Sequence, residues 1–303
     1  MRSTNVKMSQ NKGMIAGVSA GFFWGTPFIA PVILSDFSSF EITFGRFVFF
    51  GLISLCNLPR IIKLILKLNV AQMVTLLMLS SAGFWVYTLM LFAGIQLSNG
   101  VIASLIMGCM PLTVILFSKP RVNGFLFAGL SLILLGLLSL LLVPLLQQNL
   151  SLQNVRASGV ILVFLALFTW TWFAIKNSHF MHANPEINSV DYSSLVGLIN
   201  LAIMIPIFGM LHGMSTLLHH TDLGHFILWS MVLGIGASWI ANILWAYCAK
   251  NCHAAIGGAL VVSETVSGVA YNLIYTQRLP YSNEVIALLC LLCGVIVVIR
   301  SQQ

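Results

Sequence analysis

Charge is scarce in this sequence, and polar stretches long enough to build a soluble domain are missing. Of its 303 residues only 7% are charged, whereas 59% are hydrophobic. A water-soluble domain of this size needs a far more highly charged surface, so that class of protein is excluded. The sequence predicts an integral membrane protein made almost entirely of membrane-spanning segments.

Sequence motifs of known enzyme and metal chemistry are also missing. The chain has no glycine-rich phosphate loop and no H-E-x-x-H motif. His219, His220, Asp222 and His225 cluster in the sequence, but their spacing matches no dedicated zinc motif. We predict that the protein is not an enzyme and holds no metal. This cluster is the one region where a membrane-embedded enzyme would place catalytic groups.

Cysteine is infrequent, and all six cysteines lie in or beside apolar segments. Cys290 and Cys293 form a C-x-x-C motif, but the motif lies inside an unbroken apolar run. Free cysteine packs like a small hydrophobic residue. We therefore interpret these residues as packing groups rather than as redox or metal sites.

Long apolar runs recur along the whole chain. Crossing the hydrocarbon core takes roughly 20 apolar residues. A crossing segment must be helical, because lipid offers its backbone no hydrogen-bond partner. We predict an all-α integral membrane fold with ten transmembrane helices, at residues 13–34, 40–58, 70–93, 98–118, 123–146, 157–178, 188–210, 225–248, 253–276 and 282–300.

The basic residues alternate with these runs. Of the 14 lysines and arginines, 11 fall in every second gap or at the termini, two fall in the other gaps, and Arg46 lies inside a span. Loops rich in Lys and Arg stay in the cytoplasm, so the pattern predicts that both termini are cytoplasmic. The net charge of +7 then faces anionic lipid and does not indicate nucleic-acid binding. We expect the N-terminal segment to be retained as the first helix rather than cleaved as a signal peptide.

The chain divides into two halves of five spans each, separated by the polar stretch from Gln147 to Asn154. An odd number of spans per half gives the halves opposite orientations, and such inverted repeats are common in secondary transporters. The predicted division is a tail at residues 1–12, a first five-helix repeat at 13–146, a linker at 147–156, a second repeat at 157–300 and a tail at 301–303. A small-residue segment precedes Met110-Pro111 in the fourth span, and another precedes Glu264 in the ninth.

Small residues and prolines indicate where helices approach closely and where they bend. Gly17, Gly21 and Gly25 recur every four residues, which predicts a groove that admits another backbone. Pro27 and Pro31 follow and predict a bend in the outer half of the first span. Pro111 and Pro206 are expected to bend the fourth and seventh spans.

Glu264 is the strongest candidate for a functional residue. It lies about halfway along the ninth span, where a carboxylate costs at least ~2.5 kcal/mol. Its presence there indicates a cation, a proton or a polar cavity nearby; the alternative is a protonated glutamate that holds two helices together. Ser267, Gly268, Tyr271 and Tyr275 share its helical face, which we predict points inward.

Arg46 is the second charge predicted to lie within the membrane. It would bind an anionic part of the substrate or form an ion pair that changes between conformations, with Glu41 five residues earlier. Alternatively, it bonds backbone carbonyls or extends to the outer surface. Both interpretations remain open at this stage.

Aromatic residues are frequent within the spans, and several lie deep. Trp24, Trp85, Trp239 and Tyr271 together predict an aromatic box, which would attract a cation. Simple packing explains each of them about equally well. Trp245 and Tyr247 lie near a cytoplasmic end, where aromatic residues act as interface anchors. Two further polar residues at membrane depth, Asn200 and Asn242, would bind substrate or bridge helices.

Several short motifs resemble the drug/metabolite transporter superfamily, in its EamA-like branch. They are Trp24-Gly25, Arg46-Phe47, Met110-Pro111 and Glu264, in the order that this family has them. The resemblance implies two inverted five-helix repeats, a central cavity, alternating access and a bacterial inner (cytoplasmic) membrane location. It also implies small metabolites as substrates, such as amino acids, nucleobases, amines or drugs, moved by proton coupling or exchange.

The sequence departs from the family pattern at three places. Thr265 replaces the proline that commonly follows the acid, Gln277 stands near the place of a second acid, and Lys119-Pro120-Arg121 replaces an acidic turn. A coupling scheme based on those acids therefore does not carry over. Any carboxylate chemistry at the membrane midplane would depend on Glu264 alone.

The most favoured function is a secondary transporter for a small metabolite, an amino acid or a related amine. Glu264, Trp24, Trp85, Trp239, Asn242, Tyr271 and Ser267 are the candidate substrate-binding residues, and Glu264 and Arg46 are the candidates for coupling or gating. One alternative is uptake of choline or another quaternary amine. Another is a non-transporting membrane protein or a membrane-embedded enzyme. We expect no cofactor, leave proton coupling open, and expect a monomer or a dimer in the bilayer.

Overall fold

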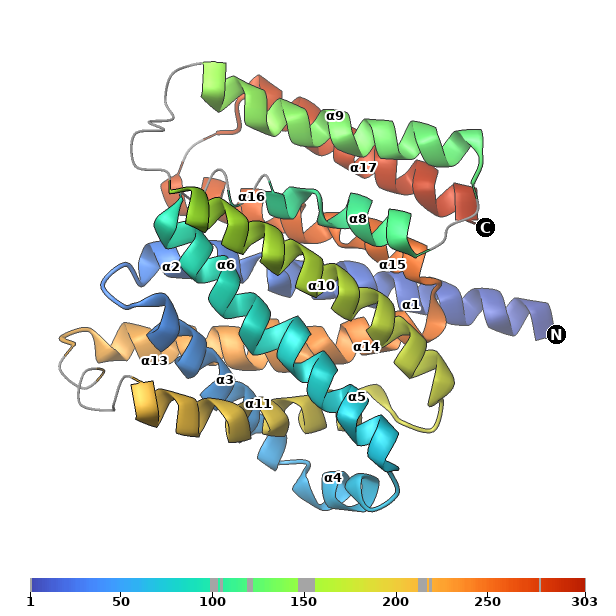
Figure 1. Ribbon diagram of the computed structural model, residues 1–303. Helices are drawn as coiled ribbons and strands as arrows, with labels where there is room; N and C mark the ends of the chain where they lie inside the picture. Colours follow the sequence, from blue (N-terminus) through green and yellow to red (C-terminus); the bar gives the residue numbers. More distant parts are fainter. Residues whose placement is uncertain are drawn as a thin grey trace.

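The computed structural model describes residues 2–98, 103, 106–118, 122–146, 156–211, 217, 220–277 and 279–302. These residues form helices and turns, with no strand among them (Figure 1). Six helices in this part of the chain are long and apolar enough to cross a membrane, and a seventh span results if one bent pair is counted as a single crossing. The all-helical membrane class is therefore confirmed.

The helices of the first half lie within or around the predicted ranges. The predicted spans 98–118 and 123–146 contain α8 and α9, and the linker stretch 147–155 lies outside the described residues. The elements are α1 (Arg2–Trp24), the 3-10 turn η1 (Thr26–Phe28), α2 (Ala30–Ile33), α3 (Ser39–Leu55), α4 (Leu58–Ile65), α5 (Val70–Ser80), the π-helical segment η2 (Ser81–Trp85), α6 (Val86–Leu97), α8 (Met110–Phe117) and α9 (Gly124–Leu146).

The helices of the second half also lie within or around the predicted ranges. Its elements are α10 (Ala157–Ala183), α11 (Ser189–Leu211), α13 (Leu223–Met231), the π-helical segment η4 (Val232–Ile240), α14 (Ala241–Asn251), α15 (Ala254–Leu260), α16 (Val262–Thr276) and α17 (Ser282–Gln302). Both π segments interrupt a long helix in its middle. Such segments are rare and occur frequently at functional sites.

The first helix and its bend differ in part from expectation. α1 already begins at Arg2, so residues that we expected in a polar tail are helical. The predicted bend after Gly25 is present, because the chain passes through the 3-10 turn that contains Pro27 before α2 begins. Pro111 lies at the start of α8, whereas α11 continues through Pro206.

The basic stretch after the predicted second span is a helix rather than a loop. α3 starts with a capping box, in which the Ser38 hydroxyl accepts from the Glu41 backbone N–H and the Glu41 carboxylate accepts from the Ser38 N–H at 2.8 Å. α3 ends at Leu55, and α4 leaves it at an angle of 87°. One face of α4 carries apolar side chains and the other carries Arg60 and Lys63, a pattern typical of a helix that lies along a membrane surface.

Helices far apart in the sequence pack side by side. α9 and α17 lie together along one edge of the molecule, α3 packs against α11, and α1 packs against α14 (Figure 1). At the crossing of α9 and α17, a Cβ at Gly129 would lie 3.0 Å from the carbonyl oxygen of Gly294. A Cβ at Gly294 would lie 2.9 Å from the carbonyl oxygen of Gly129. The two backbones are therefore in direct contact.

Both ends of the chain lie at the same end of the bundle (Figure 1). Ser9 in α1 donates a hydrogen bond to Asn251 at the end of α14, and Lys250 donates to the carbonyl oxygen of Ile187 ahead of α11. Asn57 at the corner of α3 and α4 donates to Asp191 in the first turn of α11 at 2.9 Å. We call this end of the bundle the terminal end.

Candidate functional site

Glu264 lies in the first turn of α16, halfway along the helical stretch Ala254–Tyr275 that is long and apolar enough to cross a membrane. The chain turns at Val261, between α15 and α16, and the Glu264 N–H donates to the Val261 carbonyl oxygen at 2.9 Å. The side chain is buried, with 6% of its surface exposed. A carboxylate in the first turn of a helix is stabilised by the helix dipole, which lowers the cost of keeping it there.

The glycines of α1 form the predicted groove, and α16 occupies it. A Cβ at Gly21 would lie 1.8 Å from the Ser263 hydroxyl oxygen, and a Cβ at Gly25 would lie 2.3 Å from that of Ser267. The Ser267 hydroxyl donates to the Gly21 carbonyl oxygen at 2.9 Å. The groove prediction is confirmed, and the backbone on both sides of Glu264 is fixed against α1.

The predicted inward face of the ninth span is buried only at its start. Glu264 and Ser267 are buried, whereas the Tyr271 hydroxyl is at the surface and donates to the Phe22 carbonyl oxygen at 2.8 Å. Tyr275, at 52% exposure, faces outward. The face turns from the core to the surface, because α16 runs from the break at its start to the edge of the bundle. The prediction for Tyr275 was wrong.

Three ionisable side chains from different elements converge in the core. Arg46 of α3, Tyr87 of α6 and Glu264 of α16 are all buried and interact electrostatically with one another. Arg46 and Glu264 make no direct ion pair in the described part of the chain. The two opposite charges therefore belong to one cluster without neutralising each other by contact.

Arg46 is fixed by the π-helical segment of the eighth span. Its Nε donates to the Ser238 hydroxyl oxygen at 2.8 Å, and its Nη2 donates to the Ala237 carbonyl oxygen at 3.4 Å. The Ser238 hydroxyl in turn donates to the Leu233 carbonyl oxygen, five residues earlier. Arg46 is 6% exposed, so it does not extend to the outer surface. Glu41 is not its partner, because Glu41 caps α3 and contacts His220 at 3.3 Å.

Three tryptophans form a cluster within the same hydrophobic core that contains Tyr87. The ring centroid of Trp24 lies 5.8 Å from that of Trp170 and 5.2 Å from that of Trp245, and the centroids of Trp170 and Trp245 are 5.8 Å apart. Trp245 is 3% exposed, so the prediction that it anchors the interface was wrong. α14 directs this side chain toward α1 and α10, whereas Tyr247 stays at the surface.

The four residues of the predicted aromatic box are not brought together by ring contacts. Within the described residues, Trp24 makes no ring contact with Trp85, Trp239 or Tyr271. Trp239 is bound to α11 instead, because its Nε1 donates to the Ser194 hydroxyl at 3.0 Å. The sequence reasoning missed Trp170, although its depth within the sixth span was visible as a signal.

Several buried polar side-chain atoms have no hydrogen-bond partner among the described residues. They include both amide atoms of Asn242, both of Asn177, and the ring nitrogens of Trp85 and Trp245. Asn242 and Trp245 are three residues apart on α14, so they lie on one face of the helix. An unpartnered buried polar group costs about 1–3 kcal/mol. These atoms are therefore available to bind a polar ligand.

The histidine cluster shows no metal site in the described residues. His219 lies outside them, His220 contacts Glu41, and the His225 imidazole contacts the Asp222 carboxylate at 2.8 Å. No group of three or more potential ligands was found in the part of the chain that the structure describes. Asn200, the other polar residue predicted at depth, donates to the Val196 carbonyl of its own helix at 2.9 Å.

Comparison with known proteins shows which family the first half of the chain resembles. Residues 11–145 match the EamA-like transporter family. These residues form an EamA-like domain of the drug/metabolite transporter superfamily. The chain is also 23% identical to the inner membrane protein YtfF of Escherichia coli (strain K12), over 96% of this chain and 95% of that protein. A protein of known crystal structure has the same fold, with a TM-score of 0.74 and 18% identity, over 95% of this chain and 98% of the other.

The chain is thus an integral membrane protein with six or seven candidate spans among its described residues, and its first half matches a family of membrane transporters. The cluster of Arg46, Tyr87 and Glu264 lies on three of its helices, next to the two π-helical segments and the break before α16. We call this cluster, together with Trp24, Trp170, Trp245 and Asn242, the central site.

Proposed function

We propose that this EamA-like transporter moves an amino acid or a related amine across the inner membrane by alternating access. The observation that carries the proposal is the burial of Arg46 and Glu264 in one electrostatic cluster without a direct ion pair. A zwitterion has one charge for each of them. Its ammonium group binds Glu264, and its carboxylate binds Arg46, with the planar guanidinium suited to that geometry.

The remaining parts of the central site supply shape and hydrogen bonds. Trp24, Trp170 and Trp245 give a broad aromatic wall that favours a cationic group. The amide of Asn242 forms hydrogen bonds with the substrate, which satisfies both of its unpartnered atoms. Trp85 and Trp239 shape the cavity from the two π-helical spans. Ser267 and Tyr271 contribute indirectly, by holding α16 against α1.

The proposed architecture is ten transmembrane helices in two inverted repeats, residues 13–146 and 157–300, around this site. The packing pairs support it. We number the spans in chain order, so that span six of the second repeat corresponds to span one of the first. Span one (α1) packs against span eight (α14). In the same way, span six (α10) packs against span three (α6). Spans two, four and five each pack against the span five places later, as α3 with α11, α8 with α15 and α9 with α17. A two-fold axis between the repeats produces this pattern.

Both termini are proposed to be cytoplasmic. The terminal end of the bundle carries Lys12 and Lys250, together with the basic helix α4, so it is the end that the positive-inside rule places in the cytoplasm. Alternating access then moves α1 and the helices packed along its glycine groove. Glu264 is also the candidate for carrying a coupled proton. A transport rate that does not change with the proton gradient or the membrane voltage would leave facilitated diffusion or exchange.

A quaternary amine such as choline is the second candidate substrate. The tryptophan cluster favours it, because aromatic faces bind quaternary ammonium groups. A quaternary amine has no carboxylate for Arg46, which is why we place it second. Competition between choline and neutral amino acids for binding to the purified protein separates the two candidates.

The test is thermal stabilisation of the purified protein by a panel of amino acids, amines and nucleobases. A ligand that binds only the folded state raises the melting temperature by mass action. We expect stabilisation by an amino acid, lost in Glu264→Gln and retained in the control Glu186→Gln, which removes a charge from an exposed loop. Stabilisation that survives in Glu264→Gln would remove this residue from the binding site. Stabilisation by nucleobases alone would overturn the proposed substrate class.

A further inference from the structure

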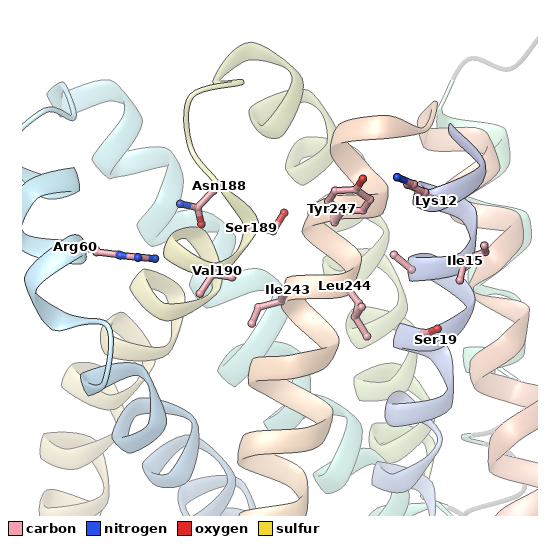
Figure 2. Close-up of a pocket in the computed structure, with 11 residues that line it drawn as sticks. Lys12, Ile15, Ser19, Arg60, Asn188, Ser189, Val190, Ile243, Leu244 and Tyr247 are labelled. Atoms are coloured by element: carbon pink, nitrogen blue, oxygen red, sulfur yellow. The ribbon is translucent and has the colours of Figure 1, made fainter. Parts of the chain in front are cut away.

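A groove lined by both basic and apolar side chains lies at the terminal end of the bundle (Figure 2). α14 lies between α1 on one side and α11 and α4 on the other, and the groove has a volume of about 670 Å³. It is lined by Lys12, Ile15, Ala16, Ser19, Arg60, Asn188, Ser189, Val190, Ile243, Leu244 and Tyr247. None of these residues belongs to the central site.

The charges of the groove are positive and unpaired. Figure 2 shows Lys12 on α1 at one side and Arg60 on α4 at the other. Neither side chain makes a hydrogen bond or an ion pair within the described residues, and no acidic residue is among those that line the groove. The neighbouring Asp191 is already engaged, because its carboxylate accepts hydrogen bonds from Asn57 and Asn188. The groove therefore complements an anion.

Most of the other residues that line the groove are apolar. Ile243 and Leu244 lie along α14 and Val190 along α11. Ile15, at 68% exposure, faces outward from α1. Tyr247 lies at the charged end and has both a ring and a hydroxyl, as residues at the headgroup level of a membrane commonly do. The groove thus passes from a basic surface into the apolar side of the bundle.

We propose that this groove binds an anionic glycerophospholipid. The anionic headgroup lies at the charged end of the groove, flanked by Lys12 on one side and Arg60 on the other, and an acyl chain lies along Ile243 and Leu244. Basic pockets between transmembrane helices on the cytoplasmic side are suited to such headgroups. The volume lies in the range of small-molecule sites, which is enough for part of a lipid whose remainder stays in the bilayer. The inference is independent of which substrate the central site takes.

Binding of phosphatidylglycerol to the purified full-length protein tests the proposal, with native mass spectrometry in a neutral detergent as the measurement. The double variant Lys12→Gln/Arg60→Gln is compared with Lys63→Gln/Lys67→Gln. The control removes two equally exposed cations at and just after α4 that do not line the groove. We expect about 30-fold weaker binding in the first variant, roughly fivefold for each cation, and less than about twofold in the second. Equal losses in both, or no loss in the first, would overturn the proposal.

Two further comparisons distinguish a lipid from a free phosphate. Phosphatidylcholine has the same chains but no net charge, and glycerol 3-phosphate has the phosphate but no chains. We expect neither to match phosphatidylglycerol. The variant Ser19→Phe fills the apolar part of the groove, so it should weaken lipid binding while the melting temperature without lipid stays within a few degrees. Tight binding of glycerol 3-phosphate that Ser19→Phe does not affect would identify a phosphate site instead.

Discussion

A Cβ at Gly21 of α1 would lie 2.9 Å from the backbone nitrogen of Glu264, so the two backbones meet at the start of α16. The same Cβ would be 1.8 Å from the Ser263 hydroxyl oxygen. The carboxylate of the central site is therefore positioned by a contact between two main chains. Because this contact is between backbones, the start of α16 cannot come closer to α1.

Replacing Gly21 with alanine should destabilise the transporter and lower its activity. The extra methyl group forces α16 away from α1, and overpacking of this kind costs typically about 1–3 kcal/mol. We expect a lower melting temperature and a reduced transport rate in proteoliposomes. Gly209→Ala is the control, because nothing lies within 4 Å of a Cβ at that position. A Gly21→Ala protein with unchanged melting temperature and rate would show that the contact is not needed.

Replacing Arg46 with glutamine should separate amino acids from simple amines. The variant retains hydrogen-bonding capacity toward Ser238 but has no charge for a substrate carboxylate. Truncating one partner of a buried charge pair costs 2 kcal/mol or more, so amino-acid affinity should fall by at least about 30-fold. An amine without a carboxylate should bind with nearly unchanged affinity. Equal losses for both ligands, measured by calorimetry, would assign Arg46 to structure alone.

Trp245→Phe tests whether the unpartnered ring nitrogen serves the substrate. Phenylalanine keeps an aromatic ring beside Trp24 but removes the buried N–H, which has no partner in the described residues. The free energy of unfolding should change little, since loss of ring area is offset by removal of an unsatisfied donor. We expect substrate affinity to fall about tenfold, by titration calorimetry. Trp170→Phe, which retains the ring cluster and leaves the N–H of Trp245 in place, is the control.

Single cysteines should report the orientation of the bundle. In a background without the native cysteines, Lys12→Cys and Lys67→Cys should react with a membrane-impermeant maleimide only after the inner membrane is opened. Gly224→Cys, in the turn that begins α13 at the opposite end, should react in intact spheroplasts. The reverse pattern would place the termini outside and would contradict the positive-inside assignment.

The sequence indicates which residues lie deep in the membrane. It does not indicate toward which neighbouring helix their side chains point. Glu264 and Arg46 stand out because charges are rare within apolar runs, and the glycine repeat of α1 indicates a close neighbour. Trp245 was assigned to the interface because its position along the helix is near an end, although the face it lies on directs it inward. Which helix packs on that face depends on contacts between segments remote in the chain.

Local breaks in the helices were only partly predictable. Pro27 indicates the bend after α1, because proline cannot continue the hydrogen-bond pattern. The turn at Val261 has no proline beside it, and the π-helical segment around Ser238 has none either. The first of these segments packs against α1 and the second against α3. The bond between Arg46 and Ser238 depends on such a break, so serine at that position carried no signal in the sequence.

The crossing of Gly129 and Gly294 also constrains how this protein can change over evolutionary time. At each glycine the atoms that a Cβ would meet include a carbonyl oxygen and an amide nitrogen of the other backbone, so no substitution in the partner removes them. A larger residue at one position therefore has no compensating mutation at the other. Neither glycine can be replaced unless α9 and α17 move apart. We therefore expect both glycines to be retained in related proteins even where the surrounding leucines and valines have changed.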